Sequence, residues 1–302
     1  MDKKFFCFFL FFFFIVLTMG CIDIGNGEEV EEKEMIGEIS STILIDGVER
    51  NTLDLISGQG AEIGLNIKNH GTKSIENVTI RMVGYLKEDY SNNETDEIFP
   101  NTEYYFNWGV IAPELGSGER ISSPVFFRVC FDSNTVSYSD VITIPEGHGS
   151  PPTPYSTTSS DYLTVLYNIP PTRIISGREN RIVGEIIIRN IGSGSIDYEI
   201  YRDGLTRNTL RDITVELKGL PGAEIARYSG REIGDTIVSL DSRDEDINLL
   251  RLIRGHELRA RIEITIPDLD EYQRTTQIGG LELDINHGYC IDTPSITLNL
   301  RG

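Results

Sequence analysis

The sequence predicts an all-β protein with two tandem β-sandwiches that follow an N-terminal signal or anchor segment. Apolar and polar residues alternate with a period of two, Gly- and Asn-containing turns separate short segments, and helical i, i+4 spacing is almost absent. The chain has 302 residues, enough for two domains of ordinary size. Its hydrophobic content of 39% and charged content of 25% are typical of globular proteins.

Residues 1–21 have the composition of an export signal. Lys3 and Lys4 precede an apolar run that ends at Met19, and Gly20 and Cys21 follow it. A basic segment, an uncharged apolar core and a small residue before the cleavage site are the parts of such a signal. The lysines stay on the cytoplasmic side, so the remainder of the chain is expected outside the cytoplasm.

Residues 17–21 resemble the lipobox of bacterial and archaeal lipoproteins, although Thr18 and Met19 depart from the preferred residues. The resemblance implies that Cys21 becomes the lipid-modified N-terminus and anchors the protein in the cell membrane. Two alternatives remain open. The apolar run is near the lower length limit of a spanning helix, so it could stay uncleaved. The segment could also direct full secretion.

Strong acidity limits the classes of partner. The formal net charge is −20, and residues 22–35 include a run of glutamates that predicts a solvated spacer. Nucleic acid is not expected as a partner, because the sequence has no basic patch to neutralise phosphates. A basic partner is compatible with this charge.

The first sandwich is predicted over residues 36–145. Ala61–Lys68 and Ile75–Val83 alternate at period two, and the turn residues Asn69 and Gly71 lie between them. Residues 146–161 are rich in Pro, Ser and Thr, which predicts a linker. The second sandwich is predicted over residues 162–302.

An internal repeat supports this division. Leu65–Ile75 and Ile186–Ile196 both read apolar, any, apolar, basic, Asn, any, Gly, two more, Ser-Ile. Further matches follow in the same order, and Cys130 and Cys290 occupy equivalent positions near the ends of the two repeats. An order-preserving set of matches predicts a duplicated module.

The repeated module resembles the archaeal and bacterial cell-surface domains of the CARDB and NEW3-like type. The resemblance rests on a strand, an N-x-G turn, a second strand, and later a Leu-x-x-Gly-Glu turn at Leu115–Glu119. It implies two Ig-like β-sandwich domains without a shared active site. The expected function is therefore structural, adhesive or protein-binding in the cell envelope, and the alternative is a solute- or glycan-binding lipoprotein that uses sandwich loops.

No pattern in the sequence predicts catalysis or a cofactor. There is no G-x-S-x-G nucleophile elbow and no H-x-x-x-H metal spacing. Surface turns are the expected positions of all four histidines: His70, His148, His256 and His287. No convergent acid, base and nucleophile can be recognised.

Two kinds of surface site are candidates. Asp241, Asp244 and Asp246 supply oxygen ligands for calcium, although the segment lacks the glycine and closing glutamate of a helix-loop-helix site. Asn93 and Asn77 are N-glycosylation sequons, which matter because the protein is expected outside the cytoplasm. Asn93 is the better candidate because it lies in a predicted polar loop over residues 89–97.

Cys130 and Cys290 leave two alternatives open. An oxidising exterior permits a disulfide between them. They lie about 160 residues apart in different predicted domains, so free and buried thiols are the favoured interpretation.

An aromatic cluster over Tyr104–Trp108 also has two interpretations. It is expected to pack in the core of the first sandwich. The alternative is an exposed platform for a glycan or a protein.

The anchor can be tested on membrane-extracted protein. We expect an intact mass that matches cleavage before Cys21 plus a lipid group, because the lipobox places the modified cysteine there. In the Cys21→Ala variant this mass should disappear. A full-length mass that the substitution leaves unchanged would instead indicate a spanning helix.

Overall fold

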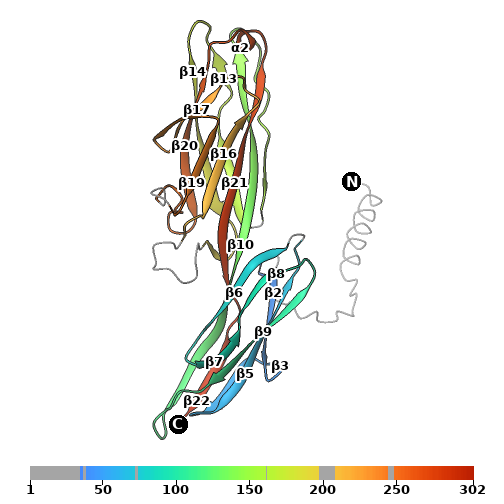
Figure 1. Cartoon of the computed structure of the whole chain (residues 1–302), viewed down its shortest axis with the longest axis vertical. Helices are drawn as coiled ribbons and strands as arrows, with labels where there is room; N and C mark the ends of the chain where they lie inside the picture. Colours follow the sequence, from blue (N-terminus) through green and yellow to red (C-terminus); the bar gives the residue numbers. More distant parts are fainter. Residues whose placement is uncertain (1–34, 37–38, 72–73, 161, 197–207, 244–247) are drawn as a thin grey trace, which may run out of the picture. The chain divides into compact units, whose positions relative to one another are not determined.

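The computed structural model describes residues 35–36, 39–71, 74–160, 162–196, 208–243 and 248–302, which belong to one compact unit. The signal segment with Cys21 lies outside these residues. The fold is all-β apart from one short helix among the described residues, α2 (Asp270–Arg274), so the predicted fold class is confirmed (Figure 1). Within the same residues, no helix has the length and apolar character needed to cross a membrane.

The first lobe is β-sandwich-like and has two sheets. One sheet has the order β1 (Met35–Ile36), β2 (Ile39–Ile45), β5 (Gly60–Asn69), β9 (Glu103–Ile111) and β7 (Lys87–Asn92), with β3 (Val48–Glu49) on β2. The other has the order β4 (Thr52–Ile56), β22 (Ile296–Arg301), β10 (Arg120–Pro145), β6 (Ile75–Val83) and β8 (Glu94–Ile98). Trp108 of β9 packs on Phe127 of β10 with ring centroids 4.4 Å apart, which joins the two sheets through the core.

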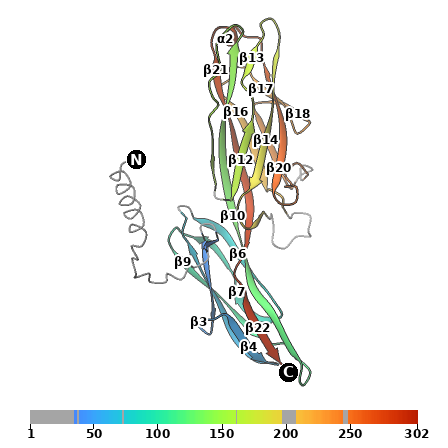
Figure 2. The same ribbon diagram turned by 180° about the vertical axis from the view of Figure 1, so that it is seen from behind.

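The second lobe repeats this plan (Figure 2). One sheet has the order β12 (Leu163–Asn168), β14 (Asn180–Asn190), β20 (Glu257–Ile266), β17 (Glu224–Tyr228) and β18 (Arg231–Asp235). The other has the order β19 (Ile237–Asp241), β16 (Asp212–Lys218), β21 (Gln277–Asp292) and β10. Three short strands complete it: β11 (Ser156–Ser159) and β13 (Thr172–Ile174) pair with β10, and β15 (Ser195–Ile196) pairs with β21.

The strand β10 belongs to both lobes, as Figures 1 and 2 show. Its residues 120–125 pair with β22 in the first lobe, and its residues 128–143 pair with β21 in the second. Between these stretches the Thr293 N–H donates to the Phe127 carbonyl at 2.8 Å. Two chain segments far apart in sequence therefore form one antiparallel ribbon, which we call the central ribbon.

Strand pairing crosses the sequence-predicted boundaries 36–145 and 162–302. The second half of β10 lies in the second lobe, and the last strand of the chain, β22, lies in the first. Part of the predicted linker is also a strand, because Ser156–Ser159 pairs with residues 136–139 of β10. The sequence pattern identified strands but not their partners.

The local reasons for these elements agree with the sequence. β14 alternates buried and exposed residues along its first half, as one buried face of a strand requires. The repeat also makes the same turn twice: the side-chain carbonyl of Asn69 accepts from the Gly71 N–H at 2.9 Å, and that of Asn190 accepts from the Gly192 N–H at 3.1 Å.

Two segments differ from the sequence expectation. The predicted polar loop over residues 89–97 consists mainly of β7 and β8, in which solvent-facing polar side chains hid the strand pattern. His287 was expected at a surface turn, but it lies inside β21 and is fully buried. The flanking Asn286 and Gly288 suggested a turn, whereas pairing with β10 keeps the backbone extended.

The favoured interpretation of Cys130 and Cys290 as free thiols was wrong, because they form a disulfide. The two residues lie directly opposite each other in the central ribbon, with Cα atoms 4.1 Å apart. Separation along the chain was a poor guide, because antiparallel pairing places residues 160 positions apart side by side.

Removing this disulfide should destabilise the protein by about 2–5 kcal/mol, since it closes a long loop in the unfolded chain. Urea unfolding of the oxidised protein and of the Cys130→Ala/Cys290→Ala variant measures the difference. The Cys130→Ala single variant is the matched control. Its free energy of unfolding should fall by as much as that of the double variant. Equal urea midpoints for wild type and variants would contradict a stabilising cross-link.

Candidate functional site

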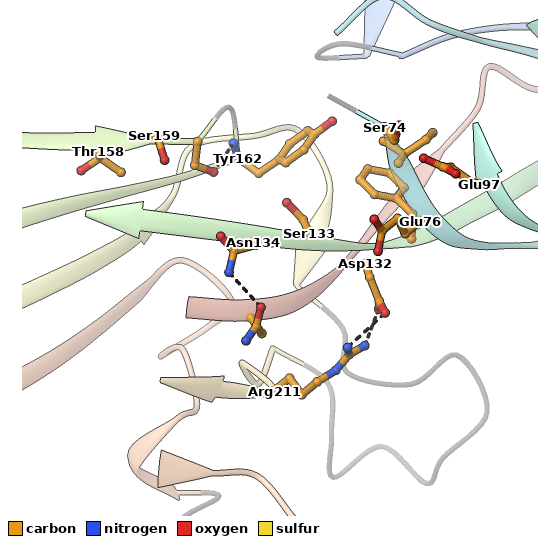
Figure 3. A pocket seen from close by; sticks show the side chains of 14 residues that line it. Ser74, Glu76, Glu97, Asp132, Ser133, Asn134, Thr158, Ser159, Tyr162 and Arg211 are labelled. Carbon is orange, nitrogen blue, oxygen red and sulfur yellow. Dashed lines mark hydrogen bonds and ion pairs between the residues drawn. The ribbon is translucent and has the colours of Figure 1, made fainter. Parts of the chain in front are cut away.

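A cavity of about 780 Å³ lies where β10 passes from the first lobe to the second (Figure 3). Its lining is mostly polar and comes from β6, β8, β10, the segment around β11, and the second lobe. The lining residues are Ser74, Ile75, Glu76, Glu97, Phe131, Asp132, Ser133, Asn134, Thr158, Ser159, Ser160, Tyr162, Arg211 and Asn286.

The cavity coincides with a gap in strand pairing. On one edge of β10, β6 pairs as far as Asp132, and β11 begins to pair at Val136. Among the described residues, no strand pairs with Ser133–Thr135 on this edge, whereas β21 pairs continuously along the other edge. Within the described part of the chain, a short stretch of strand edge is therefore uncovered.

The peptide groups of Asn134 face this gap. Alternate residues of a strand direct their N–H and C=O groups to opposite edges. The Phe127 carbonyl accepts from Thr293 on the ribbon side, and the Asp140 N–H donates to the Tyr155 carbonyl on the other side. Asn134 is an even number of residues from Asp140, so its donor and acceptor point into the gap.

A polar network holds the backbone around Asn134. The Asn134 amide nitrogen donates to the Asn286 side-chain oxygen at 2.9 Å, and the Asn286 amide nitrogen donates to Asp212 at 2.7 Å. These bonds tie β10 to β21 and β16 across the outer face of the sheet. The uncovered edge is therefore presented by a fixed strand.

The Asp132 carboxylate beside the gap is already compensated. Both terminal nitrogens of Arg211 donate to its two oxygens, and Figure 3 shows this ion pair. The Asn77 amide nitrogen donates to the same carboxylate at 2.8 Å. Asn77 has a positive φ of 51° at an irregularity in the pairing of β6 with β10, which positions it for this contact.

Two further carboxylates in the lining are not compensated. Glu76 of β6 and Glu97 of β8 lie directly opposite each other in register and both line the cavity. Neither has an ion-pair partner within the described part of the chain. Like charges at directly opposite positions destabilise a sheet, so a cation placed between them would be favourable.

One wall of the cavity is aromatic. Tyr162 stacks on Tyr289 with ring centroids 4.2 Å apart. The ring centroids of Phe131 and Tyr162 are 5.6 Å apart. The Tyr289 hydroxyl accepts from the Gly194 N–H at 2.7 Å, which fixes this ring. The wall is therefore a rigid apolar surface beside polar groups.

His287 lies opposite Ser133 in the central ribbon and is fully buried. Neither ring nitrogen has a hydrogen-bond partner among the described residues. Burial, together with the nearby Arg211 charge, lowers the pKa of His287 to about 4. The imidazole is therefore neutral at neutral pH.

The described residues of the sequence-predicted surface sites do not line the cavity. Asp241 ends β19, and its carboxylate accepts from the Arg243 N–H at 2.8 Å. Asp244 and Asp246 lie outside the described residues, and within those residues no three metal-ligating side chains come together. Calcium binding at this loop stays a prediction.

The two sequons occupy different environments. Asn93 lies between β7 and β8, is half-buried, and its carbonyl accepts from the Ile80 N–H. Asn77 lies in β6 and uses its amide nitrogen to hold Asp132, as described above. Glycosylation of either residue stays a prediction.

Sequence reasoning missed the residues that form the gap. The signal was present, because four consecutive polar residues, Asp132–Thr135, interrupt the alternation that surrounds them. The importance of Arg211 and Asn286 could not be recognised, since both reach the cavity only through long-range pairing.

Comparisons with known proteins add no family. No family model matches the chain, and no curated protein matches it. Among solved structures, a protein of unknown function from Porphyromonas gingivalis W83 is 11% identical, with 88% of this chain and 100% of that chain covered and a TM-score of 0.21.

Two other solved structures are similarly distant. The secreted serine protease VesC from Vibrio cholerae is 8% identical, with coverage of 82% and 51% and a TM-score of 0.19. The Escherichia coli alpha-2-macroglobulin activated by porcine elastase is 10% identical, with coverage of 87% and 33% and a TM-score of 0.18. This chain therefore spans about half and a third of those two chains. None of the three establishes a shared fold or function.

The buried histidine predicts a specific acid sensitivity. Its pKa is about 4 in the folded state against 6.5 as the ordinary value, so only the unfolded state binds its proton between these pH values. Proton uptake by His287 in the unfolded state should therefore lower the free energy of unfolding by about 3 kcal/mol as the pH falls from 7 to 4. Urea unfolding at both pH values should show a correspondingly smaller loss for His287→Leu than for wild type.

The control for this experiment is His148→Leu, which removes an exposed histidine. It should lose as much stability as wild type over the same pH range. An identical pH dependence for His287→Leu and wild type would show that His287 is protonated equally in both states.

Proposed function

We propose that this chain is a membrane-anchored, extracytoplasmic protein of the cell envelope that binds a partner protein. Two Ig-like sandwiches would hold the binding site away from the membrane, with the acidic spacer next to the anchor. The observation that carries the proposal is the uncovered edge of β10 at Asn134. The function is binding, and no catalysis is expected.

The proposed location is supported by two independent features. The N-terminal segment has the composition of an export signal and ends in a lipobox-like sequence. The Cys130–Cys290 disulfide fits an oxidising compartment outside the cytoplasm.

The gap favours an extended peptide as the ligand. A sheet edge binds a strand through main-chain hydrogen bonds, and its pockets select the side chains. The gap spans Ser133–Thr135, a length that fits about three residues of an added strand. The Asn134 N–H and C=O would bond the central peptide residue, and the cavity volume leaves room for its side chains.

The charges favour a basic side chain in that peptide. Glu76 and Glu97 face each other without a cation, whereas Asp132 is neutralised by Arg211. A lysine or arginine between the two glutamates would relieve their repulsion. The net charge of −20 would also accelerate the approach of a basic partner.

The same residues argue against hydrolysis at this site. Ser133 lies opposite His287, but the ring nitrogens make no hydrogen bond to it or to any other described residue. The imidazole is fully buried and cannot reach a substrate in the cavity. A nucleophile without a base in hydrogen-bond reach is not activated.

The test uses a blocked pentapeptide that has lysine at the centre of alternating valine and threonine. Isothermal titration calorimetry with the full-length protein should show saturable binding, and the same peptide with central glutamate should bind roughly tenfold more weakly or not at all. The Glu76→Gln/Glu97→Gln variant should remove this preference for lysine.

The backbone contact has its own matched pair of variants. Asn134→Pro removes the N–H that faces the gap together with the side-chain bonds to β21, and it leaves the backbone pairing of the neighbouring residues with β21 in place, so peptide affinity should fall roughly three- to tenfold. Asn134→Ala keeps that N–H and removes the same side-chain bonds, so its affinity should stay close to wild type. Equal affinity of both variants, or no saturable peptide binding by wild type, would refute the proposal.

A further inference from the structure

Two tyrosine rings lie on the sheet β5–β9–β7 of the first lobe. This is not the sheet that contains the β10 gap. Tyr90 of β7 lies directly opposite Gly109 of β9, and its ring covers that glycine. The Tyr105 ring covers Gly64 of β5 in the same way. A Cβ atom at either glycine would overlap the tyrosine side chain, so the glycines allow both side chains to approach the backbone of the sheet.

These rings belong to the outer face of the sheet. On β9, Phe106 and Trp108 are fully buried. Tyr105, on the same strand, is 42% exposed. Tyr90 is 50% exposed. Successive residues of a strand point to opposite faces, so one strand supplies both the core and this surface. We call the outer surface around Tyr90 and Tyr105 the tyrosine face.

A hydrogen bond holds the Tyr105 ring of this face in position. The Tyr105 hydroxyl donates to a Glu62 carboxylate oxygen at 3.2 Å, and burial together with this contact raises the pKa of Tyr105. Strand geometry places the two covered glycines about 8 Å apart, two residues along the strands and one strand across. Rigid tyrosines give a large contact area at a low entropic cost.

Amide side chains surround the two rings. Asn92, Asn107 and Gly64 lie opposite one another across β7, β9 and β5, and Asn66 lies opposite Tyr105. The side chains of Asn92 and Asn107 make no hydrogen bond to other described residues. Each amide can both donate and accept a hydrogen bond. The tyrosine face therefore offers hydrogen-bonding groups beside the two aromatic rings.

From this arrangement we propose that the tyrosine face binds a neutral carbohydrate. A pyranose ring has an apolar C–H face that stacks on an aromatic ring, and its hydroxyls donate to and accept from amides and carboxylates. Glu103 on the same face is paired with Lys68, but the Glu62 carboxylate, together with the net charge of −20, repels uronic acids, sulfated sugars and nucleotides. This inference goes beyond the proposed peptide site and does not depend on it.

The experiment is native affinity electrophoresis of the full-length protein in detergent, with soluble neutral polysaccharides in the gel. Mannan, dextran and hydroxyethyl cellulose are the probes, and polygalacturonate is the anionic comparison. At least one neutral polysaccharide should retard wild type, and polygalacturonate should not. Retardation by none of the neutral probes, or equal retardation by polygalacturonate, would overturn the proposal.

Variants then locate the binding. Tyr90→Ala and Tyr105→Ala should each weaken binding roughly tenfold, because each removes one stacking ring. Tyr90→Phe keeps the ring and should retain binding, which separates ring stacking from a loss of folding. Tyr155→Ala removes a tyrosine that is 62% exposed elsewhere and should bind as wild type does. Equal losses in Tyr155→Ala and Tyr90→Ala would overturn the assignment to this face.

Discussion

The central ribbon is the constraint on which the rest of the structure depends. It joins two chain segments that are separated by more than a hundred residues, so forming it closes a long loop at an entropic cost. Antiparallel pairing of β10 with β21 and with β22, the Cys130–Cys290 disulfide and the Arg128–Asp292 ion pair offset that cost. Each lobe then builds its second sheet on one part of the same two strands.

Sharing β10 between two lobes also explains the gap. The first lobe needs β6 as a neighbour of β10, and the second lobe needs β11 and β13 on the same edge. These neighbours do not meet, and Ser133–Thr135 lies between them. Long uncovered edges invite aggregation, so a short edge flanked by charges is a safer place for a binding site. The architecture thus leaves a short edge for the proposed peptide without exposing a whole strand.

The aromatic residues of the first lobe lie on both faces of one sheet. Trp108 and Phe127 join the sheets of the first lobe from the inner face, while Tyr105 lies on the outer face of the same strand. Gly64 and Gly109 lower strand stability, because glycine has high conformational freedom and no side chain to pack. The tyrosine rings that cover them restore apolar contact and remain about half exposed.

The sequence by itself determined the all-β class, most strand positions and the repeated Asn–Gly turn, because alternation and turn chemistry act between neighbouring residues. The tertiary structure alone decided that Cys130 bonds Cys290, that β22 returns to the first lobe and that His287 is buried. All three depend on which strand pairs with which, and in what register. That choice is made by contacts between distant segments, which local periodicity does not specify.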